Sequence, residues 1–350
     1  MNLMTSNIVW YLVLLCGAQC RGSVLARGGS IATNLTLLLD VDTGVDDALA
    51  IGLALGSGAD VAAITTVAGN TRLVAAQENT LRVLRVFGRT DIPVFRGADR
   101  PLDGEWNPEE HYFGDDGFGE MSAHYDVGVN AAGTAGLGDD GAPAALRIIE
   151  LVRARPGQLT LVLLGPLTNA AIALLVDPHF TRGLREMVIL GGNRQGRGNV
   201  APGSEFNFHT DPEAAHIVLQ RVQCPVTIVP WETALLSTLP WPVYHNLVLK
   251  NGTRAQFMAD VTRHTRRCCE AGKEGFNVGD ALAVLAALAP SSVLESVDRR
   301  VAVELSGHHT RGQMVQAWSP TMLPQVQRTV KLVKALDRRL LANYMAKAFS

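Results

Sequence analysis

The sequence carries almost no net charge and has little that would attract a polyanionic partner. Its 350 residues include 31 lysines and arginines against 33 aspartates and glutamates, which gives a formal net charge of −2 and a pI near 6.5. Nucleic acid and stable association with an anionic membrane, which both depend on bulk charge, are therefore excluded. The expected partner is a small molecule held in a pocket, and a homo-oligomer is left open.

Cysteines are also scarce. Of the five, Cys16 and Cys20 lie near the N-terminus, which leaves Cys224, Cys268 and Cys269 as an odd remainder. An odd number does not make a disulfide framework, so stability must come from the hydrophobic core. Hydrophobic residues form 47% of the chain and charged residues 18%, which allows a sizeable core and excludes wholesale disorder.

The N-terminal apolar run, residues 8–18, is too short to span a bilayer comfortably. Small residues follow at Ala18 and Cys20, which is typical of a secretory signal peptide, although no lysine or arginine precedes the run. We expect a signal peptide over residues 1–26 and a folded domain over residues 33–350. The protein would then be secreted, or cytoplasmic if this run is not a signal peptide.

Short apolar runs rich in β-branched residues alternate with helical patterns along the chain. This rhythm predicts a single α/β domain with a mostly parallel open sheet flanked by helices, without repeats or linkers. The expected strands are 35–40, 61–67, 93–95, 159–164, 186–190, 226–229, 301–305, 313–318 and 326–331. The expected helices are 46–56, 73–87, 142–154, 168–176, 211–222, a helical region over 241–270, 281–288 and 333–347.

Four carboxylates crowd into residues 40–47 (DVDTGVDD), directly after an apolar run. Buried acids at this density repel one another and lose hydration, which is costly unless something neutralises them. A hard divalent cation such as Ca²⁺ or Mg²⁺ takes carboxylate and carbonyl oxygens as ligands. The cluster therefore predicts a metal site. Helix capping by Asp46 or Asp47, or pairing of Asp40 with a buried arginine, explains only part of it.

Two other acidic patterns fit less well. An EF-hand loop fails because Gly44 stands where a ligand belongs and Val45 where the glycine belongs. The haloacid dehalogenase-type phosphatases also begin with a strand and Asp-x-Asp, but they usually continue Gly-Thr and lack two further acids. Gly279-Asp280 resembles their later metal motif, although no second acid follows at helical spacing. That class remains an alternative.

Glycine-containing polar turns follow several expected strands. They are residues 40–47, 69–70, 165–169 and 191–193. In open parallel sheets, binding sites form beyond the carboxyl ends of the strands. We therefore expect these turns to converge on one rim of the sheet.

Several separated segments resemble the nucleoside hydrolases of the inosine–uridine-preferring type. The segments are 40–47, 66–70 (TVAGN), 165–169 (GPLTN), 191–192 (GG), 205–207 (EFN), 211–215 (DPEAA) and 279–281 (GDA). The first is highly specific for that family, whereas GPLTN alone is weak. The resemblance covers most of the chain after residue 35 and implies Ca²⁺-dependent hydrolysis of the N-glycosidic bond of ribonucleosides to ribose and free base.

The resemblance also implies roles for individual residues. Asp42 is similar to the carboxylate that takes a proton from a Ca²⁺-bound water. The implied metal ligands are Asp42, Asp47, Asp280 and the backbone carbonyl of Leu164. The implied ribose-binding residues are Asp46, Asn70, Asn207 and Asp280 at the 2′- and 3′-hydroxyls, and Asn199 and Glu205 at the 5′-hydroxyl. The reaction passes through an oxocarbenium-like ribosyl cation, which a ring of carboxylates stabilises.

The base-binding side departs from the family pattern. Members that accept both inosine and uridine usually carry a histidine immediately before the aspartate matched by Asp280, whereas this chain has Gly279. Purine-preferring members stack the base between aromatic residues, so the sequence favours purines. The candidates are Trp106, His111, Tyr112, Phe113, Phe276, Trp231 and His209, and His111 is also expected to contact or protonate the base. Each of these residues, taken alone, is better explained by ordinary packing. A secreted nucleoside-binding protein without catalysis remains an alternative to the enzyme.

Overall fold

The computed structural model describes residues 35–106, 112–127, 141–269, 274–319 and 321–350. The expected signal peptide and His111 lie outside the described residues. Within the described ranges, no helix is both long enough and apolar enough to cross a membrane.

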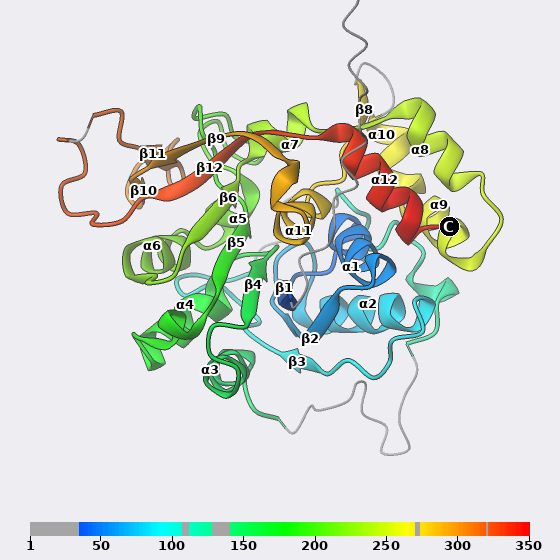
Figure 1. Cartoon of the computed structure of the whole chain (residues 1–350), viewed down its shortest axis with the longest axis horizontal. Coiled ribbons are helices and arrows are strands. Elements are labelled where there is room, and N and C mark those ends of the chain that lie inside the picture. Colours follow the sequence, from blue (N-terminus) through cyan, green and yellow to red (C-terminus); the bar gives the residue numbers. More distant parts are fainter. Residues whose placement is uncertain (1–34, 107–111, 128–140, 270–273, 320) are drawn as a thin grey trace, which may run out of the picture.

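An eight-stranded sheet forms the centre of the described chain, in the order β3-β2-β1-β4-β5-β6-β12-β9 (Figure 1). Its neighbouring strands pair in parallel, apart from the antiparallel pair β12–β9 at one edge. The mostly parallel sheet expected from the sequence is thus confirmed. The strands are β1 (Thr36–Val41), β2 (Asp60–Thr66), β3 (Val94–Arg96), β4 (Leu159–Leu163), β5 (Glu186–Leu190), β6 (Val226–Val229), β9 (Val293–Arg299) and β12 (Val330–Leu336). Two small antiparallel pairs join β10 (Val301–Val303) to β11 (Met314–Gln316) and β7 (Leu239–Pro240) to β8 (Gly275–Phe276).

Helices cover both faces of the sheet (Figure 1). On one face lie α1 (Val45–Ser57), α2 (Leu73–Val86), α8 (Trp241–Val248), α9 (Thr253–Val261), α11 (Ala281–Leu288) and α12 (Arg338–Ala348). On the other face lie α3 (Ala144–Ala154), α4 (Thr168–Val176) and α6 (Pro212–Arg221). The remaining helices are α5 (Phe206–Thr210), α7 (Trp231–Leu236) and α10 (Arg263–Cys269), with 3₁₀ turns at Ser122–His124, Phe180–Gly183 and Pro290–Ser292.

A hydrophobic core lies on each face of the sheet, and β1 contributes side chains to both, because side chains alternate across a strand. Leu37 and Leu39 pack in the core beneath α1, α11 and α12, whereas Leu38 packs in the core beneath α3, α4 and α6. All three leucines are fully buried, and truncating such a residue to alanine typically costs about 2–5 kcal/mol. The carboxylate loop, which we define as the residues from Asp42 to Asp47, therefore follows a strand that is held by buried side chains on both faces of the sheet.

The C-terminal region corrects two expectations. The strand expected over 326–331 lies later, at β12, and the helix expected from residue 333 begins only at Arg338. Val333 and Leu336 are buried in the sheet, and Asp337 caps α12 by accepting hydrogen bonds from the amides of Arg339 (2.8 Å) and Leu340 (3.1 Å). Strand β9 was not expected. It lies at an edge of the sheet and is largely exposed, so its sequence does not alternate between apolar and polar residues as a half-buried strand does.

Candidate active site

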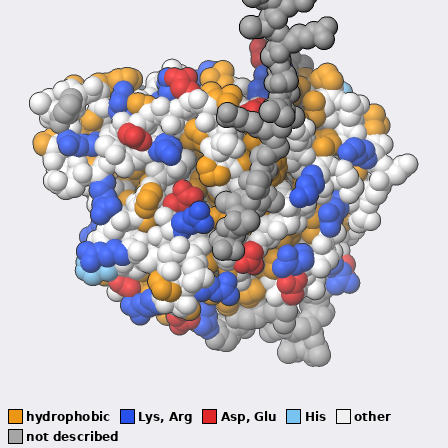
Figure 2. All heavy atoms as spheres, viewed as in Figure 1, with side chains coloured by type: hydrophobic (Ala, Val, Ile, Leu, Met, Phe, Trp, Pro, Cys, Tyr) orange, Lys and Arg blue, Asp and Glu red, His pale blue; other side chains and the backbone are white. Residues whose placement is uncertain are grey.

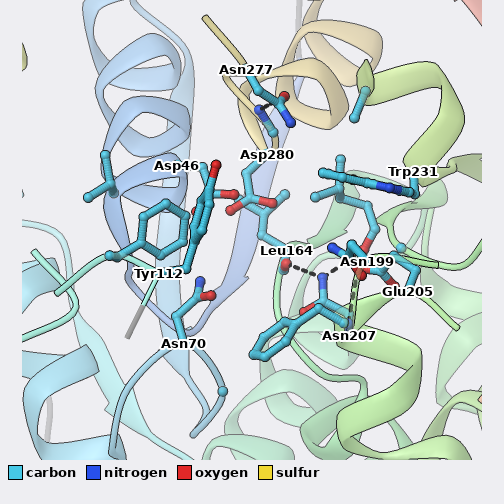
Figure 3. A pocket seen from close by; sticks show the side chains of 18 of the residues that line it. Asp46, Asn70, Tyr112, Leu164, Asn199, Glu205, Asn207, Trp231, Asn277 and Asp280 are labelled. Carbon is cyan, nitrogen blue, oxygen red and sulfur yellow. Dashed lines mark hydrogen bonds between the residues drawn. The ribbon is translucent and has the colours of Figure 1, made fainter. Parts of the chain in front are cut away.

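The glycine-containing turns converge at the carboxyl ends of the parallel strands, as expected. A cavity of about 330 Å³ opens there (Figure 3). The turns after β2, β4 and β5 contribute Asn70, Leu164 and Gly191 to its wall, and Asp46 comes from the first turn of α1. Further wall segments come from 112–113, 199–200, 205–207, 231–234 and 276–280.

Asp42 is fully buried beside this cavity. Its Oδ2 accepts a hydrogen bond from the Asn70 amide (2.6 Å), whereas its Oδ1 has no hydrogen-bond partner in the described structure. A Cβ added at Gly69 would lie 2.1 Å from Oδ2, and one added at Gly165 would lie 2.7 Å from Oδ1. Both positions therefore require glycine, and the two glycines hold the Asp42 carboxylate in place. Gly69 is part of the cavity wall, so this carboxylate lies directly behind the wall.

Among the described residues, Asp46, Asp47 and Asp280 form a group of acids that could hold a metal ion. One carboxylate oxygen of each lies within 4.8 Å of the others. Asp46 and Asp47 begin α1 and Asp280 precedes α11, so three acids meet at two helix N-termini, where negative charge is favoured. Figure 3 shows Asp46 and Asp280 next to each other at the cavity. In the described chain, Asp46 Oδ1 and Asp280 Oδ2 are buried without hydrogen-bond partners.

Asp47 links this group to Asp42. Its Oδ1 accepts a hydrogen bond from the Asp42 amide (3.3 Å), and its Oδ2 accepts from the Gly44 amide (3.0 Å) and from Asn70 Nδ2 (3.1 Å). The loop between β1 and α1 is thus folded around the Asp47 carboxylate. Asn70 contacts both acids, through its backbone to Asp42 and through its side chain to Asp47.

Without a bound cation, the protonation equilibria of these acids are shifted toward the neutral form. Burial and the neighbouring carboxylates raise the pKa of Asp42, Asp46 and Asp280 well above the usual range. Burial also raises the pKa of Asp47, to about 6, and hydrogen bonds from the Gly44 amide and other donors limit the rise. Bare, buried carboxylate oxygens of this kind fit a hard divalent cation, whose charge would favour the ionised forms.

The carbonyl of Leu164, implied as a metal ligand, follows β4 and lines the cavity. It accepts a hydrogen bond from Asn207 Nδ2 (2.7 Å), which also donates to the Leu190 carbonyl (3.1 Å). A carbonyl oxygen has two lone pairs, so this bond leaves room for a metal. Asn207 therefore ties the ends of β4 and β5 together at the cavity floor (Figure 3).

Glu205 and Asn199 both line the cavity. Glu205 caps α5: its carboxylate accepts hydrogen bonds from the amides of Asn207 (3.0 Å), Phe208 (3.2 Å) and Gly192 (2.7 Å). Burial raises its pKa to about 7. Asn199 lies on the exposed loop before α5, and its amide donates to the Ser204 carbonyl (3.1 Å).

Glu232 supports the same loop, a role that the sequence did not indicate. It is buried, and its carboxylate accepts hydrogen bonds from the amides of Arg194 (2.7 Å) and Gln195 (2.6 Å). The available signal was an acid two residues after Pro230, which itself follows the buried strand β6. Its role depends on a segment 37 residues away, which no local pattern reveals.

Asp40 supports the site from below. Its carboxylate is fully buried and accepts hydrogen bonds from Thr65 Oγ1 (2.5 Å) and Asn169 Nδ2 (2.8 Å). Asn169 also donates to the Thr66 carbonyl (3.0 Å) and accepts from the Ala98 amide (2.9 Å). The GPLTN segment therefore serves to connect β1, β2 and the turn after β3.

Five aromatic residues among those described line the cavity. Tyr112 and Phe113 come from the loop before α3, Phe206 from the start of α5, Trp231 from the start of α7 and Phe276 from β8. Trp106 lies elsewhere: its Nε1 donates to the Gly69 carbonyl (3.0 Å), and its ring lies 4.9 Å from the Arg72 guanidinium carbon. Two further lining residues, Thr265 and Asn277, were not expected from the sequence.

The fold and the site define a mostly parallel α/β protein in which buried carboxylates adjoin a cavity with a partly aromatic wall. Residues 37–343 match the family model described as inosine-uridine preferring nucleoside hydrolase, and the chain belongs to this family. It is therefore an enzyme of the nucleoside hydrolase class, which hydrolyses the N-glycosidic bond of ribonucleosides. This membership replaces the haloacid dehalogenase-type alternative and favours an enzyme over a binding protein.

Individual relatives agree with the family match. An inosine-uridine preferring nucleoside hydrolase of Leishmania major is 33% identical over 283 residues, which cover 80% of this chain and 86% of the relative. A probable uridine nucleosidase 2 of Arabidopsis thaliana is 38% identical over 194 residues, but the match spans only 57% of that relative. The solved structure of an inosine-guanosine nucleoside hydrolase superposes with a TM-score of 0.79 at 32% identity, covering 90% of this chain and 98% of that structure.

Proposed function

We propose that this enzyme hydrolyses ribonucleosides with a preference for purines, using Ca²⁺ held by the carboxylate cluster and a water activated by Asp42. The observation that carries the proposal is the set of bare, buried oxygens on Asp42, Asp46 and Asp280 beside a cavity with an aromatic wall. Such oxygens need a cation, and the cavity beside them needs a ligand with both polar and aromatic parts.

The polar floor of the cavity suits a ribose. Asp46, Asp280 and Asn70 offer oxygen acceptors or amide groups near the cluster, where the 2′- and 3′-hydroxyls would bind. The Nδ2 of Asn207 is already held by two carbonyls, so its Oδ1 is the group that a hydroxyl could reach. Asn199 and Glu205 would meet the 5′-hydroxyl at the other end of the floor.

The reaction requires a water, a base and stabilisation of a cationic sugar. Ca²⁺ bound by Asp42, Asp47, Asp280 and the Leu164 carbonyl would lower the pKa of a water and place it next to the sugar. The free Oδ1 of Asp42 accepts the proton as the water oxygen bonds to C1′ and the C1′–N bond breaks toward the base. Asp46 and Asp280 stabilise the positive charge that develops on the ribosyl group.

The aromatic wall supports a preference for purines. Tyr112, Phe113, Trp231 and Phe276 supply flat apolar surface, and a bicyclic base covers more of it than a pyrimidine does. One solved structure similar to this chain is titled an inosine-guanosine nucleoside hydrolase, which agrees with this direction. Gly279 provides no side chain that could protonate the leaving base, so the base must be activated by other contacts.

A panel of nucleosides tests the proposal. Purified protein is incubated with inosine, guanosine, adenosine and uridine in excess Ca²⁺, and free reducing sugar is measured. We expect turnover of all the purines, with a higher kcat/KM for inosine and guanosine than for uridine. Turnover of uridine alone would contradict the purine preference, and failure with all four would contradict the hydrolase function.

The location of the protein is a separate proposal. The apolar run at residues 8–18 supports a cleaved signal peptide over residues 1–26, followed by a secreted domain over residues 33–350. N-terminal sequencing of the protein from the medium of expressing cells would then give a start between residues 21 and 27. Retention of the whole chain inside the cells would contradict secretion.

A further inference from the structure

Asn277 lies at the cavity between Phe276 and Gly279, in a turn that leads to Asp280. Its side chain is partly exposed, and its Oδ1 accepts a hydrogen bond from the Gly279 amide (3.0 Å). Only the oxygen of a side-chain amide can accept a hydrogen bond from a backbone N–H. This bond therefore assigns the Oδ1 and Nδ2 positions of the Asn277 side chain. The nitrogen end must face away from the bond (Figure 3).

Gly279 cannot carry a side chain in this arrangement. Its φ is +42°, and a Cβ at this position would lie 2.4 Å from Asp46 Oδ2. A donor that acts on the leaving base therefore has to come from a neighbouring residue. Thr265 also lines this part of the cavity, but its hydroxyl donates to the Thr262 carbonyl (3.1 Å).

The position of Asn277 is fixed by the packing before it. The Phe276 ring stacks on Tyr244, with ring centroids 4.7 Å apart and an interplanar angle of 22°. Tyr244 is buried, and its hydroxyl is hydrogen-bonded to Thr262 Oγ1 (2.6 Å). A binding group whose neighbours are locked in this way loses little freedom when a ligand binds.

We propose that Asn277 is a specificity-determining residue whose Nδ2 donates a hydrogen bond to an acceptor on the edge of the leaving base, N7 or O6 in a purine. This inference rests on the proposed function and names the group that contacts the base next to Gly279. As the C1′–N9 bond breaks, its electron pair moves into the base and makes these acceptors more basic. A neutral amide keeps its protons, so it strengthens its hydrogen bond to the base, and the proton that the base finally gains comes from solvent.

A purely structural use of Asn277 is the competing explanation. Its Oδ1 bond to the Gly279 amide is an Asx turn, which shapes the backbone ahead of Asp280. The two ends of the amide separate the two roles, because the oxygen builds the turn and the nitrogen contacts the base. A variant that keeps an oxygen and loses the nitrogen therefore distinguishes them.

The test combines variants of Asn277 with changes of single atoms in the ligand. Asn277→Ser keeps a hydroxyl oxygen for the Gly279 amide and lacks the amide nitrogen, and Asn277→Asp is a second variant of the same shape. Dissociation constants are measured in Ca²⁺ for inosine, for 7-deazainosine, which lacks N7, and for purine riboside, which lacks O6. Binding of inosine is measured by rapid sampling, before much of it is hydrolysed. In a separate assay of turnover, competitive inhibition by ribose reports the sugar site alone.

We expect Asn277→Ser to weaken inosine binding roughly three- to tenfold, which is the usual effect of losing one hydrogen bond. At least one of the two analogues would bind the wild type and the variant equally, and inhibition by ribose would not change. Equal weakening of all three ligands, or weakened inhibition by ribose, would overturn the proposal in favour of the turn role. If the wild type cleaves no nucleoside, the proposed function fails, while the binding comparison still supports or overturns the role of Asn277.

Discussion

The backbone amide of Asn70 donates to Oδ2 of Asp42 at 2.6 Å, and this bond determines which oxygen of the carboxylate stays available. The other oxygen, Oδ1, is buried without a partner among the described residues. Gly69 and Gly165 close in on the carboxylate from two sides, so it cannot turn away. A base held in one orientation with one free oxygen is the geometry that efficient proton abstraction requires.

Gly69→Ala tests this clamp. The new Cβ would lie 2.1 Å from Asp42 Oδ2, so either the carboxylate or the turn after β2 must shift. We expect kcat for inosine to fall roughly 100-fold, because a shift of about 1 Å in a reacting group has an effect of that order. Circular dichroism would show whether the fold is retained. A well-folded variant with wild-type kcat would show that the position of Asp42 is not critical.

The pH dependence of stability without metal follows from the buried acids. Burial raises the pKa of Asp40 from 3.8 to about 7, against hydrogen bonds from Thr65 and Asn169 that oppose the rise. The folded protein then holds a proton that the unfolded chain releases. The contribution of Asp40 to stability is therefore fully present below about pH 4 and is lost as the pH rises toward 7.

Asp40→Asn isolates this contribution, because the amide is neutral at every pH. In chelator-treated protein, we expect the variant to gain stability relative to the wild type as the pH rises from 4 to 7. Urea unfolding of both proteins across this range gives the difference, in which the effects of other groups cancel. A difference that did not change with pH would contradict the raised pKa of Asp40.

Calcium should stabilise the folded protein through the cluster. A ligand that binds only the folded state at about 100 times its Kd adds about 2.7 kcal/mol to the free energy of unfolding. We expect Ca²⁺ to raise the Tm of the chelator-treated wild type, and Asp280→Asn to lose most of this rise because it removes a ligand charge. Differential scanning fluorimetry in Ca²⁺ and in Mg²⁺ measures the response.

Asp260→Asn is a matched control for the calcium experiment. Asp260 is also a buried acid, but it accepts a hydrogen bond from the Tyr125 hydroxyl (2.9 Å) away from the cavity. Its variant should therefore respond to Ca²⁺ like the wild type. Equal responses of Asp280→Asn and the wild type would place the metal elsewhere.

Asn79 connects the carboxylate loop to the aromatic wall. It is fully buried on α2, and its Nδ2 donates to the carbonyls of Thr43 and Asp116, both at 3.1 Å. The second bond holds the segment that follows Phe113. The Phe113 ring packs close to Gly44, since a Cβ on Gly44 would lie 2.8 Å from Cδ2 of this ring. We expect Asn79→Ala to raise the KM for inosine roughly tenfold, because a loosened wall loses its contact with the base.

Thr80→Val is the control for this prediction. Thr80 Oγ1 is hydrogen-bonded to Thr43 Oγ1 (2.7 Å), so the variant disturbs the same carboxylate loop from the same helix but spares the bond to Asp116. Steady-state kinetics with inosine and inhibition by ribose should show a loss at the base for Asn79→Ala alone. A similar rise in KM for both variants would argue against a specific tie to the wall.

Much of the site follows from local sequence, because it lies where strong patterns end. Residues 35–39, which include most of β1, are apolar apart from Thr36, and the acids of residues 40–47 come directly after them, so both the strand and the cluster can be predicted. The turns at Asn70, Leu164 and Gly191 follow equally clear strands. Since parallel strands point the same way, the sequence also predicts that these turns meet.

The contacts that depend on distant segments could not be predicted. Glu232 accepts hydrogen bonds from the backbone amides of a remote segment, and Asn277 lines a cavity whose other walls come from remote parts of the chain. The region 330–336 is equally compatible with a helix until Val333 is seen to pair with β9 in the sheet. Trp106 looked like a base-stacking residue, but its indole is engaged by the Gly69 carbonyl.

The most direct test of the account is the comparison of Asp42→Asn with the wild type in two assays on the same preparations. Release of reducing sugar from inosine in saturating Ca²⁺ measures turnover, and equilibrium binding of ribose measures the sugar site. We predict that Asp42→Asn remains folded and binds ribose, while kcat falls by several orders of magnitude because the proton acceptor is lost. A folded Asp42→Asn protein with near-normal turnover would contradict the role of Asp42 and, with it, the proposed mechanism.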